Sequence, residues 1–264
     1  MRWAEAWVFY AFSFYFKSFI INNSNRDSDI TLTNINNIKI YSFQSKSHFL
    51  EEIGDIKKIL IAINAEKIIK EDNRLKEIIN NNIGYTDGIG AVIALKGRGV
   101  KSVKIPGSEF WLDIIEKYHN TKTFYLIGSS RSVIDSTAKR LKQEYPNIRI
   151  LGYRDGFIGK WDKKVLKIYL RYLKPDIVYV AQGTPKQEFL MDELFKIHPA
   201  LYMGLGGSFD IYAGEKKRAP KIFLNFNLEW LYRLLQEPTR FKRQRKLIKF
   251  LFFLKDNSSY RKRS

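Results

Sequence analysis

Short apolar runs alternate with longer stretches of helical periodicity from Ile38 onward. Each apolar run has four to six residues and is bounded by glycine, asparagine or charged residues, as expected of a buried strand. The stretches between the runs carry apolar residues three and four positions apart, which is typical of helices that bury one side. This alternation predicts βαβ units and a parallel sheet. The expected strands are Ile38–Phe43, Ile59–Ile63, Thr123–Ile127, Ile148–Leu151, Ile177–Ala181 and Leu201–Leu205.

The intervening helical stretches complete an α/β prediction. They are Ser47–Ile56, Lys67–Asn80, Gly90–Leu95, Gly107–Tyr118, Val133–Tyr145, Lys163–Leu173 and Lys186–Phe195. We expect a Rossmann-like, mostly parallel sheet flanked by helices, occupying residues 35–220. Residues 1–34 form an apolar N-terminal segment and a polar linker, the linker being the Asn-rich stretch from Asn22 to Asn37. Residues 221–264 are expected to form a helical, basic C-terminal appendage.

The apolar N-terminal segment, residues 2–21, is rich in aromatic side chains. Its uninterrupted part, Ala6 to Phe16, has 11 residues, whereas a spanning helix needs about 20. Three interpretations stay open: a helix lying in a membrane interface, a poor membrane span, or an extension from a misplaced start codon. The first and the third fit the short apolar length better.

The charge of the chain points to a polyanionic partner. Its 264 residues include 46 Lys and Arg against 27 Asp and Glu, a net charge of +19. Nucleic acid, an acidic lipid surface and phosphorylated substrates all suit such a balance. Cysteine is absent, the three histidines show no metal-ligand spacing, and the D-x-D pair Asp27-Ser28-Asp29 lies in the polar linker rather than at the end of an expected strand. We therefore expect neither a metal ion nor another cofactor. The histidines, His48, His119 and His198, are expected at the surface or at helix ends.

One stretch, Tyr85 to Leu95, combines a carboxylate with two glycines just before an apolar run. Thr86 or Asp87 can cap the helix expected to follow, and an ordinary helix cap is the plainer interpretation. An acid on such a turn can also face a cleft and accept a proton there. Asp87 is thus the first candidate for a general base, and Asp155, in another glycine-containing turn, is the second.

Polar and glycine-rich loops follow almost every expected strand. In parallel sheets, ligands bind at the carboxyl ends of the strands. The turn Gly128-Ser129-Ser130 leads from a strand into a helix and can offer backbone N–H groups to a phosphate. No G-x-G-x-x-G fingerprint and no P-loop occurs. The other loops at this edge are Asn64, Asp155-Gly156, Gln182–Gln187 and Gly204–Asp210.

Six motifs occur in order and together resemble one family. They are Thr86–Gly90, Ile105–Glu109, Gly183–Glu188, Gly204–Asp210 with Ala213-Gly214, Arg218–Pro220, and Leu228–Pro238. On these motifs the chain resembles the WecG/TagA/CpsF glycosyltransferases, glycosyltransferase family 26, over about Ile38 to Phe250. The resemblance implies an inverting, metal-independent transfer of a hexose or N-acetylhexosamine, usually N-acetylmannosamine, from a UDP-sugar. The acceptor is a sugar on a membrane polyprenyl diphosphate, and the products are teichoic acid, enterobacterial common antigen, capsule or exopolysaccharide.

The resemblance also implies roles for individual residues. Asp87 matches the family's proposed general base, Asn64 its asparagine and Gln187 its helical glutamine. Ala62 departs from the family, where a threonine is frequent, and this leaves the donor sugar undefined. The residues expected to bind the substrates are Asn64, Thr86, Gly128, Ser129, Asp155, Gln187, Arg233, Arg240 and Arg243.

The C-terminal sequence adds a membrane expectation. From Arg233 to Arg263 there are eleven basic residues, interleaved with apolar ones and opposed only by Glu237 and Asp256. A basic amphipathic helix of this kind lies on anionic lipid. In relatives, such an appendage docks on the membrane and its arginines close over the active site. We expect a cytoplasmic enzyme held peripherally on the inner face of the bacterial plasma membrane.

Two other classes of protein compete with this hypothesis. A basic nucleic-acid-binding α/β protein without catalytic activity fits the charge, but no nucleic-acid motif occurs and the strand-end loops stay unexplained. A nucleotide-dependent oxidoreductase lacks its glycine fingerprint. We therefore expect no nucleic-acid partner. The sequence leaves open whether the chain forms a homo-oligomer.

Overall fold

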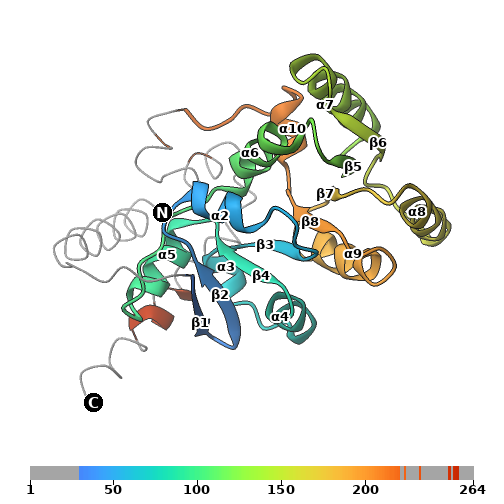
Figure 1. The fold of residues 1–264 in the computed structure, drawn as a ribbon. Coiled ribbons are helices and arrows are strands. Elements are labelled where there is room, and N and C mark those ends of the chain that lie inside the picture. The colour runs from blue at the N-terminus through green and yellow to red at the C-terminus, as the bar shows by residue number, and fades with distance from the viewer. Residues whose placement is uncertain (1–29, 221–222, 224–231, 233–248, 251, 256–264) are drawn as a thin grey trace, which may run out of the picture.

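The computed structural model describes residues 30–220, 223, 232, 249–250 and 252–255, and Figure 1 shows their arrangement. A single eight-stranded sheet runs through these residues in the order β1-β2-β4-β3-β8-β7-β5-β6. The β1–β2 pair is antiparallel, and the other pairs are parallel. This confirms the predicted α/β fold with a mostly parallel sheet. The strands are β1 (Thr31–Ile35), β2 (Ile38–Ser42), β3 (Ile59–Ile63), β4 (Ile83–Thr86), β5 (Thr123–Gly128), β6 (Arg149–Arg154), β7 (Ile177–Ala181) and β8 (Leu201–Gly204).

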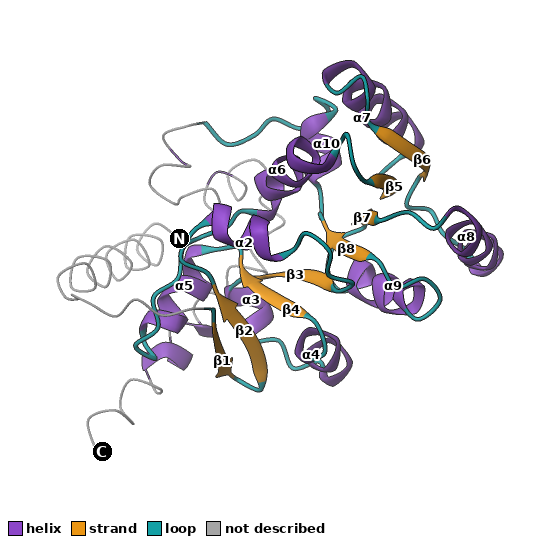
Figure 2. Ribbon diagram, in the orientation of Figure 1, coloured by secondary structure: helices purple, strands orange, loops and turns teal. Residues whose placement is uncertain are grey.

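Helices cover both faces of the sheet (Figure 2). One hydrophobic cluster joins the sheet to α3, α4, α5, α8 and α9, and a second joins it to α2, α6, α7 and α10. A parallel sheet is covered in this way because its crossovers place helices on its faces. The helices are α2 (Lys46–Glu52), α3 (Ala65–Ile68), α4 (Asn73–Asn80), α5 (Ile89–Lys96), α6 (Gly107–Tyr118), α7 (Arg131–Glu144), α8 (Lys160–Leu173), α9 (Lys186–Phe195) and α10 (Ser208–Tyr212).

The central elements match the sequence prediction most closely. β3, β7, α6 and α9 have the predicted bounds, and the other predicted elements differ by a few residues. β7 is buried at all five positions. Burial on both faces produces a continuous apolar run, and such a run between turn residues is easy to recognise.

The predicted linker was wrong at its C-terminal end, because Thr31–Ile35 forms the edge strand β1. Asn36 and Asn37 join β1 to β2 with φ angles of 51° and 63°. Two central residues with positive φ make the turn that matches the twist of a two-residue hairpin, and asparagine tolerates this conformation. The sheet therefore begins before residue 35.

One further prediction near the site was wrong, and one strand was missed. The single helix expected over Lys67–Asn80 is divided into α3 and α4, because Asp72 accepts a hydrogen bond from the N–H of Leu75 (3.0 Å) and starts a new helix. Strand β4 was not predicted. It has only four residues and contains Gly84, where a Cβ atom would lie 2.8 Å from the carbonyl oxygen of Lys39. Gly84 thus lets β2 and β4 approach closely.

In the described part of the chain, no helix has both the length and the apolar character that crossing a bilayer requires.

Candidate active site

The carboxyl edge of the sheet holds the candidate residues in two groups. β3 and β8 are neighbours, but the helices that follow them lie on opposite faces: α3 in one hydrophobic cluster and α10 in the other. A crevice opens outside the strand ends where successive connections leave in opposite directions, and ligands bind there. The loops after β3, β4, β7 and β8 surround this position, and the loops after β5 and β6 lie further along the sheet.

Asp87 stands directly after β4. Its backbone N–H donates to the carbonyl oxygen of Ile63 (3.0 Å), and its Oδ1 accepts a hydrogen bond from the N–H of Gly107 at 2.7 Å. Gly107 is the first residue of the twelve-residue helix α6. The carboxylate thus sits at the positive end of a helix dipole, which favours negative charge.

The helix-cap interpretation of this stretch was wrong. Gly88 is the N-cap of α5, and no side chain caps this helix. Neither Thr86 nor Asp87 caps α5 as predicted. The Asp87 carboxylate binds the N–H of Gly107 at the start of α6, and the Thr86 hydroxyl binds the carbonyl oxygen of Val103. Asp87 therefore contacts the N-terminus of α6 and not that of α5.

The two residues before Asp87 are fully buried. Thr86 Oγ1 donates to the carbonyl oxygen of Val103 (2.6 Å), and the N–H of Ile105 donates to the carbonyl oxygen of Thr86 (2.7 Å). Thr86 therefore holds the loop that leads to α6. The Tyr85 hydroxyl is buried without a hydrogen-bond partner, and burial together with the Asp87 charge raises the pKa of Tyr85 well above its ordinary value. Tyr85 stays a neutral phenol beside the carboxylate.

Asn64 lies beside the Asp87 turn. Ile63 pairs with Thr86 in the sheet, so the residues that follow them, Asn64 and Asp87, leave neighbouring strand ends. Asn64 Oδ1 caps α3 by accepting from the N–H of Lys67 (3.0 Å). A Cβ atom at Gly88 would lie 3.5 Å from Asn64 Cβ. The structure thus brings together the predicted base and the predicted asparagine.

Gln187 ties two strand-end loops together. It is 4% exposed, and its Oε1 accepts from the N–H groups of Gly183 (3.1 Å) and Gly206 (2.9 Å). These glycines belong to the loops after β7 and β8. Its Nε2 donates to Glu188 Oε1 at 3.2 Å, and Gly204 leaves room for the amide, since a Cβ there would lie 2.5 Å from Nε2. Gln187 thereby fixes the shape of both loops.

A buried ion pair lies under these loops and was missed by the sequence analysis. Lys67 Nζ lies 2.8 Å from Glu188 Oε1 and also donates to the carbonyl oxygen of Ala62 (2.8 Å). Burial raises the pKa of Glu188, but the Lys67 ammonium and the hydrogen bonds from Lys67, Thr184 and Gln187 outweigh it and lower the pKa overall. Glu188 stood in a recognised motif, but nothing in the sequence paired it with Lys67.

The second group of predicted residues lies after β5 and β6. Gly128 and Ser129 both have positive φ, 136° and 57°. The N–H of Gly156 donates to the carbonyl oxygen of Ser129 (2.8 Å), so the two loops contact each other. Asp155 Oδ1 accepts from the N–H of Phe157 (2.9 Å), and Gln182 Nε2 donates to the carbonyl oxygen of Gly156 (2.6 Å). Loops after β5, β6 and β7 thus form one compact corner.

The two groups do not touch. Asp87 follows β4 and Gly128 ends β5, and β3, β8 and β7 lie between these strands. Four steps between neighbouring strands separate the two positions by about 19 Å. Gln187 and the loop after β8 occupy the space between. A ligand that reaches both groups must be extended along the carboxyl edge.

Two motifs without an assigned role also meet near Asp87. Arg218 Nη2 forms an ion pair with Glu109 Oε1, and Glu109 lies in the first turn of α6. The pair fixes the Arg218–Pro220 motif beside the helix whose first N–H binds Asp87. The order of the motifs gave no sign of this contact. The predicted substrate-binding residues Arg233, Arg240 and Arg243 lie outside the described residues.

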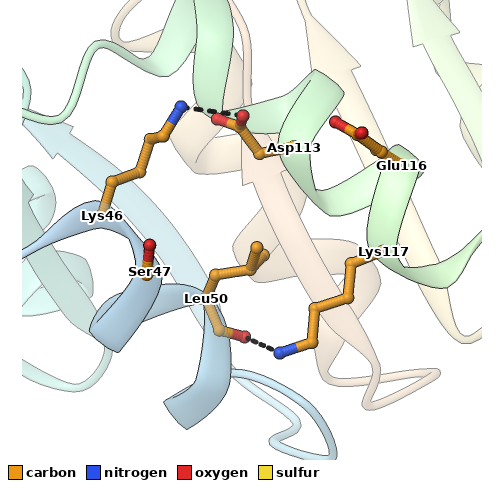
Figure 3. A pocket seen from close by; sticks show the side chains of 6 residues that line it. All are labelled: Lys46, Ser47, Leu50, Asp113, Glu116 and Lys117. Carbon is orange, nitrogen blue, oxygen red and sulfur yellow. Dashed lines mark hydrogen bonds and ion pairs between the residues drawn. The ribbon is translucent and has the colours of Figure 1, made fainter.

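The remaining features of the described residues do not add to the site. Among them, no group of three or more His, Cys, Asp or Glu side chains could hold a metal ion. A cavity of about 220 Å³ lies between α2 and α6 (Figure 3). It contains none of the predicted residues, and Lys46 Nζ spans it to bind Asp113 Oδ1 at 2.8 Å. Its lining is Lys46, Ser47, Leu50, Asp113, Glu116 and Lys117.

Fold and site define an α/β protein that binds its ligands at the carboxyl edge of a parallel sheet. The model of the glycosyl transferase WecG/TagA/CpsF family matches residues 32–263. The chain belongs to this family, as its motifs predicted. It is thus a glycosyltransferase of cell-surface polysaccharide synthesis, with a sugar donor and a polyprenyl-linked acceptor as its general substrates.

Proposed function

We propose that the chain is an inverting transferase that moves a hexose or N-acetylhexosamine from a UDP-sugar to a sugar on a polyprenyl diphosphate. The observation that carries the proposal is the placement of Asp87. Its carboxylate is held at the N-terminus of α6, beside Asn64, and does not cap α5. A carboxylate so fixed at a ligand-binding edge can act as a general base.

In the proposed reaction, Asp87 accepts the proton of the acceptor hydroxyl while that oxygen attacks the anomeric carbon. The new glycosidic bond forms as the bond from the anomeric carbon to the β-phosphate oxygen breaks, and UDP leaves with that electron pair. N–H groups and cations that meet the departing diphosphate lower the barrier, because its charge grows in the transition state. Arg233, Arg240 and Arg243 are our candidates for the cations.

The two groups of residues suit an extended nucleotide-sugar. We assign the transferred sugar to Asp87 and Asn64, with Thr86 and Gln187 shaping the loops around it. The corner of Gly128, Ser129 and Asp155 is then available to the nucleotide end of the donor. The turn Gly128-Ser129 leads into α7, and Ser130 is the N-cap of this helix. The turn therefore lies at a helix N-terminus, which favours negative charge.

The proposal places the enzyme on the inner membrane face, where a lipid-linked acceptor and a cytoplasmic donor meet. Purified chain should be incubated with a panel of UDP-sugars and a lipid-linked acceptor analogue. Formation of a glycosylated lipid with one donor is the expected result, and EDTA should leave the rate unchanged. No transfer with any UDP-sugar, or tight binding to DNA instead, would refute the proposal.

A further inference from the structure

Helix α8 exposes an unusual number of large apolar side chains. Six of the nine that are exposed in the described part of the chain lie between Phe157 and Tyr172. Trp161 is 77% exposed and Tyr172 83%. Exposed apolar groups scattered singly are ordinary, but a contiguous patch marks a contact surface. The six are Phe157, Trp161, Val165, Ile168, Tyr169 and Tyr172.

The five members on α8 form one stripe. At about 100° per residue, they fall within an arc of about 100° on the helix surface. Leu166 and Leu170 lie on another side and are buried in the hydrophobic core. Lys163 and Lys167 reach Glu193 of α9, with Nζ–O distances of 3.2 and 3.8 Å. The inner side of α8 is therefore already occupied, and the side chains of the stripe are exposed. Figure 1 shows α8 at the margin of the fold.

Basic residues run along one edge of the stripe. By the same helical spacing, this edge carries Lys160, Lys164 and Arg171. Lys164 Nζ lies 4.6 Å from the centre of the Trp161 ring, so the charge and the aromatic ring share one surface. The single acid of α8, Asp162, is engaged with the N–H of Gly159 at 2.8 Å.

We propose that this face of α8 contacts the surface of an anionic bilayer. Tryptophan and tyrosine suit the membrane interface because one end of each side chain is apolar and the other polar. Lysine and arginine beside them attract anionic headgroups while their stems cover apolar surface. A second copy of the chain would bring another molecule with a net charge of +19 to the same place, so charge favours lipid.

The position of α8 connects this contact to the site. Phe157 lies in the loop after β6, and Trp161 lies in the first turn of α8, so both are at the carboxyl edge that carries Asp87. Contact there holds this edge near the membrane. The inference rests on the proposed function in one respect, namely that the acceptor is linked to a membrane lipid. The binding of α8 to lipid can be measured without any transfer reaction.

The first test compares binding to vesicles of phosphatidylglycerol and phosphatidylcholine. The full chain carrying Trp161→Ser, Ile168→Ser and Tyr172→Ser should bind at least about tenfold more weakly, a change of 1.4 kcal/mol. All three side chains are exposed, so thermal unfolding should not change. Leu32→Ser, at another exposed apolar position, is the control and should bind normally. Normal vesicle binding by the triple variant would overturn the proposal.

The basic C-terminal sequence also suits anionic lipid, so the second test measures a signal that comes from α8 alone. Brominated lipids quench tryptophans that enter the bilayer interface. Trp161→Phe keeps an apolar ring, so this variant should bind vesicles but lose part of the quenching seen in the native chain. Equal quenching in both proteins would overturn the proposal. So would a triple variant that changes from dimer to monomer while keeping native vesicle binding, since α8 would then be a subunit contact.

Failure of this inference differs from failure of the proposed function. The triple variant should transfer sugar to a soluble short-chain acceptor at the native rate, because none of its three residues belongs to the site. Absence of transfer by the native chain would refute the function and leave the vesicle result standing.

Discussion

Single side chains decide what the carboxyl edge can do, and Asp87 is the most informative. Its hydrogen bond from the N–H of Gly107 uses one carboxylate oxygen. An asparagine can offer its amide oxygen to the same N–H but cannot take up a proton as a base. Asp87→Asn should therefore keep the fold and donor binding while transfer falls by about 10²-fold or more.

Steady-state transfer and donor titration by calorimetry check this prediction. Asp87→Ala is the companion variant, because it removes both the base and the acceptor for Gly107. It should lose stability as well as transfer. Native turnover by the asparagine variant would show that another group, with Asp155 as the next candidate, removes the proton.

The buried Lys67–Glu188 pair makes a second prediction at this level. Glu188→Gln leaves the Lys67 ammonium buried without a counter-charge, at a cost of about 3–5 kcal/mol in unfolding free energy. Lys67→Met should also destabilise, and the double variant should lose less than the sum of the two, because neither charge is then stranded. Urea unfolding of the four proteins measures this coupling. Additive losses would contradict a direct interaction.

The same pair gives the chain a pH dependence with a defined sign. The folded-state pKa of Glu188 is lowered, so its contribution to stability is complete above the unfolded-state pKa of about 4.3. The contribution is lost as pH falls from there through the folded-state value. Unfolding free energy should fall over this acidic range in the native chain and fall less in Glu188→Gln.

Among the helices, the contact of α3 with α5 depends on a glycine. A Cβ atom at Gly90 would lie 2.9 Å from Ala65 Cβ and 3.3 Å from Phe250 Cε1. Gly90→Ala should therefore push α3, α5 and Phe250 apart and lower the unfolding free energy by about 1–3 kcal/mol. An alanine would otherwise favour the helix by about 1 kcal/mol.

Gly97→Ala is the matched control, since Gly97 ends the same helix with φ of −59° and its added Cβ would come no closer than 3.4 Å to another atom. It should be neutral or slightly stabilising. A stable Gly90→Ala protein would mean that the two helices can separate freely.

At the scale of the whole molecule, the C-terminal sequence packs against the part of the fold that carries the candidate base. Phe250 is 3% exposed and belongs to the core cluster that contains α3 and α5, the helices after Asn64 and Asp87. The C-terminal sequence thus returns to the elements that carry the candidate base. This contact supports a catalytic contribution from the tail besides membrane binding.

We predict that truncation before Arg233 abolishes transfer even with a soluble short-chain acceptor. Each basic residue near an anionic surface contributes about 1 kcal/mol to binding, so eleven exceed what docking needs. Some arginines can then meet the diphosphate of the donor or of the lipid, for which a guanidinium fork is suited. Arg240→Ala or Arg243→Ala should weaken transfer more than vesicle binding. A fully active truncated enzyme would reduce the tail to an anchor.

The sequence by itself determined the α/β class, the central elements and the family. β3 and β7 were predictable because burial on both faces makes a strand continuously apolar. Asp87 was predictable as a candidate because glycines and a short apolar run surround it. The edge strand β1 was missed because its half-exposed residues look like a linker, although two asparagines between isoleucines are a hairpin signal.

Only the tertiary structure decided which of these residues meet. The order β4-β3-β8-β7-β5 places Asn64 beside Asp87 and keeps Gly128 away from both. It also joins Lys67 to Glu188 and lets Gln187 bridge the loops after β7 and β8. Hydrophobic periodicity reports whether a segment is buried, but it carries no information on which strand lies beside it. Partners distant in sequence therefore depend on how the crossovers close the sheet.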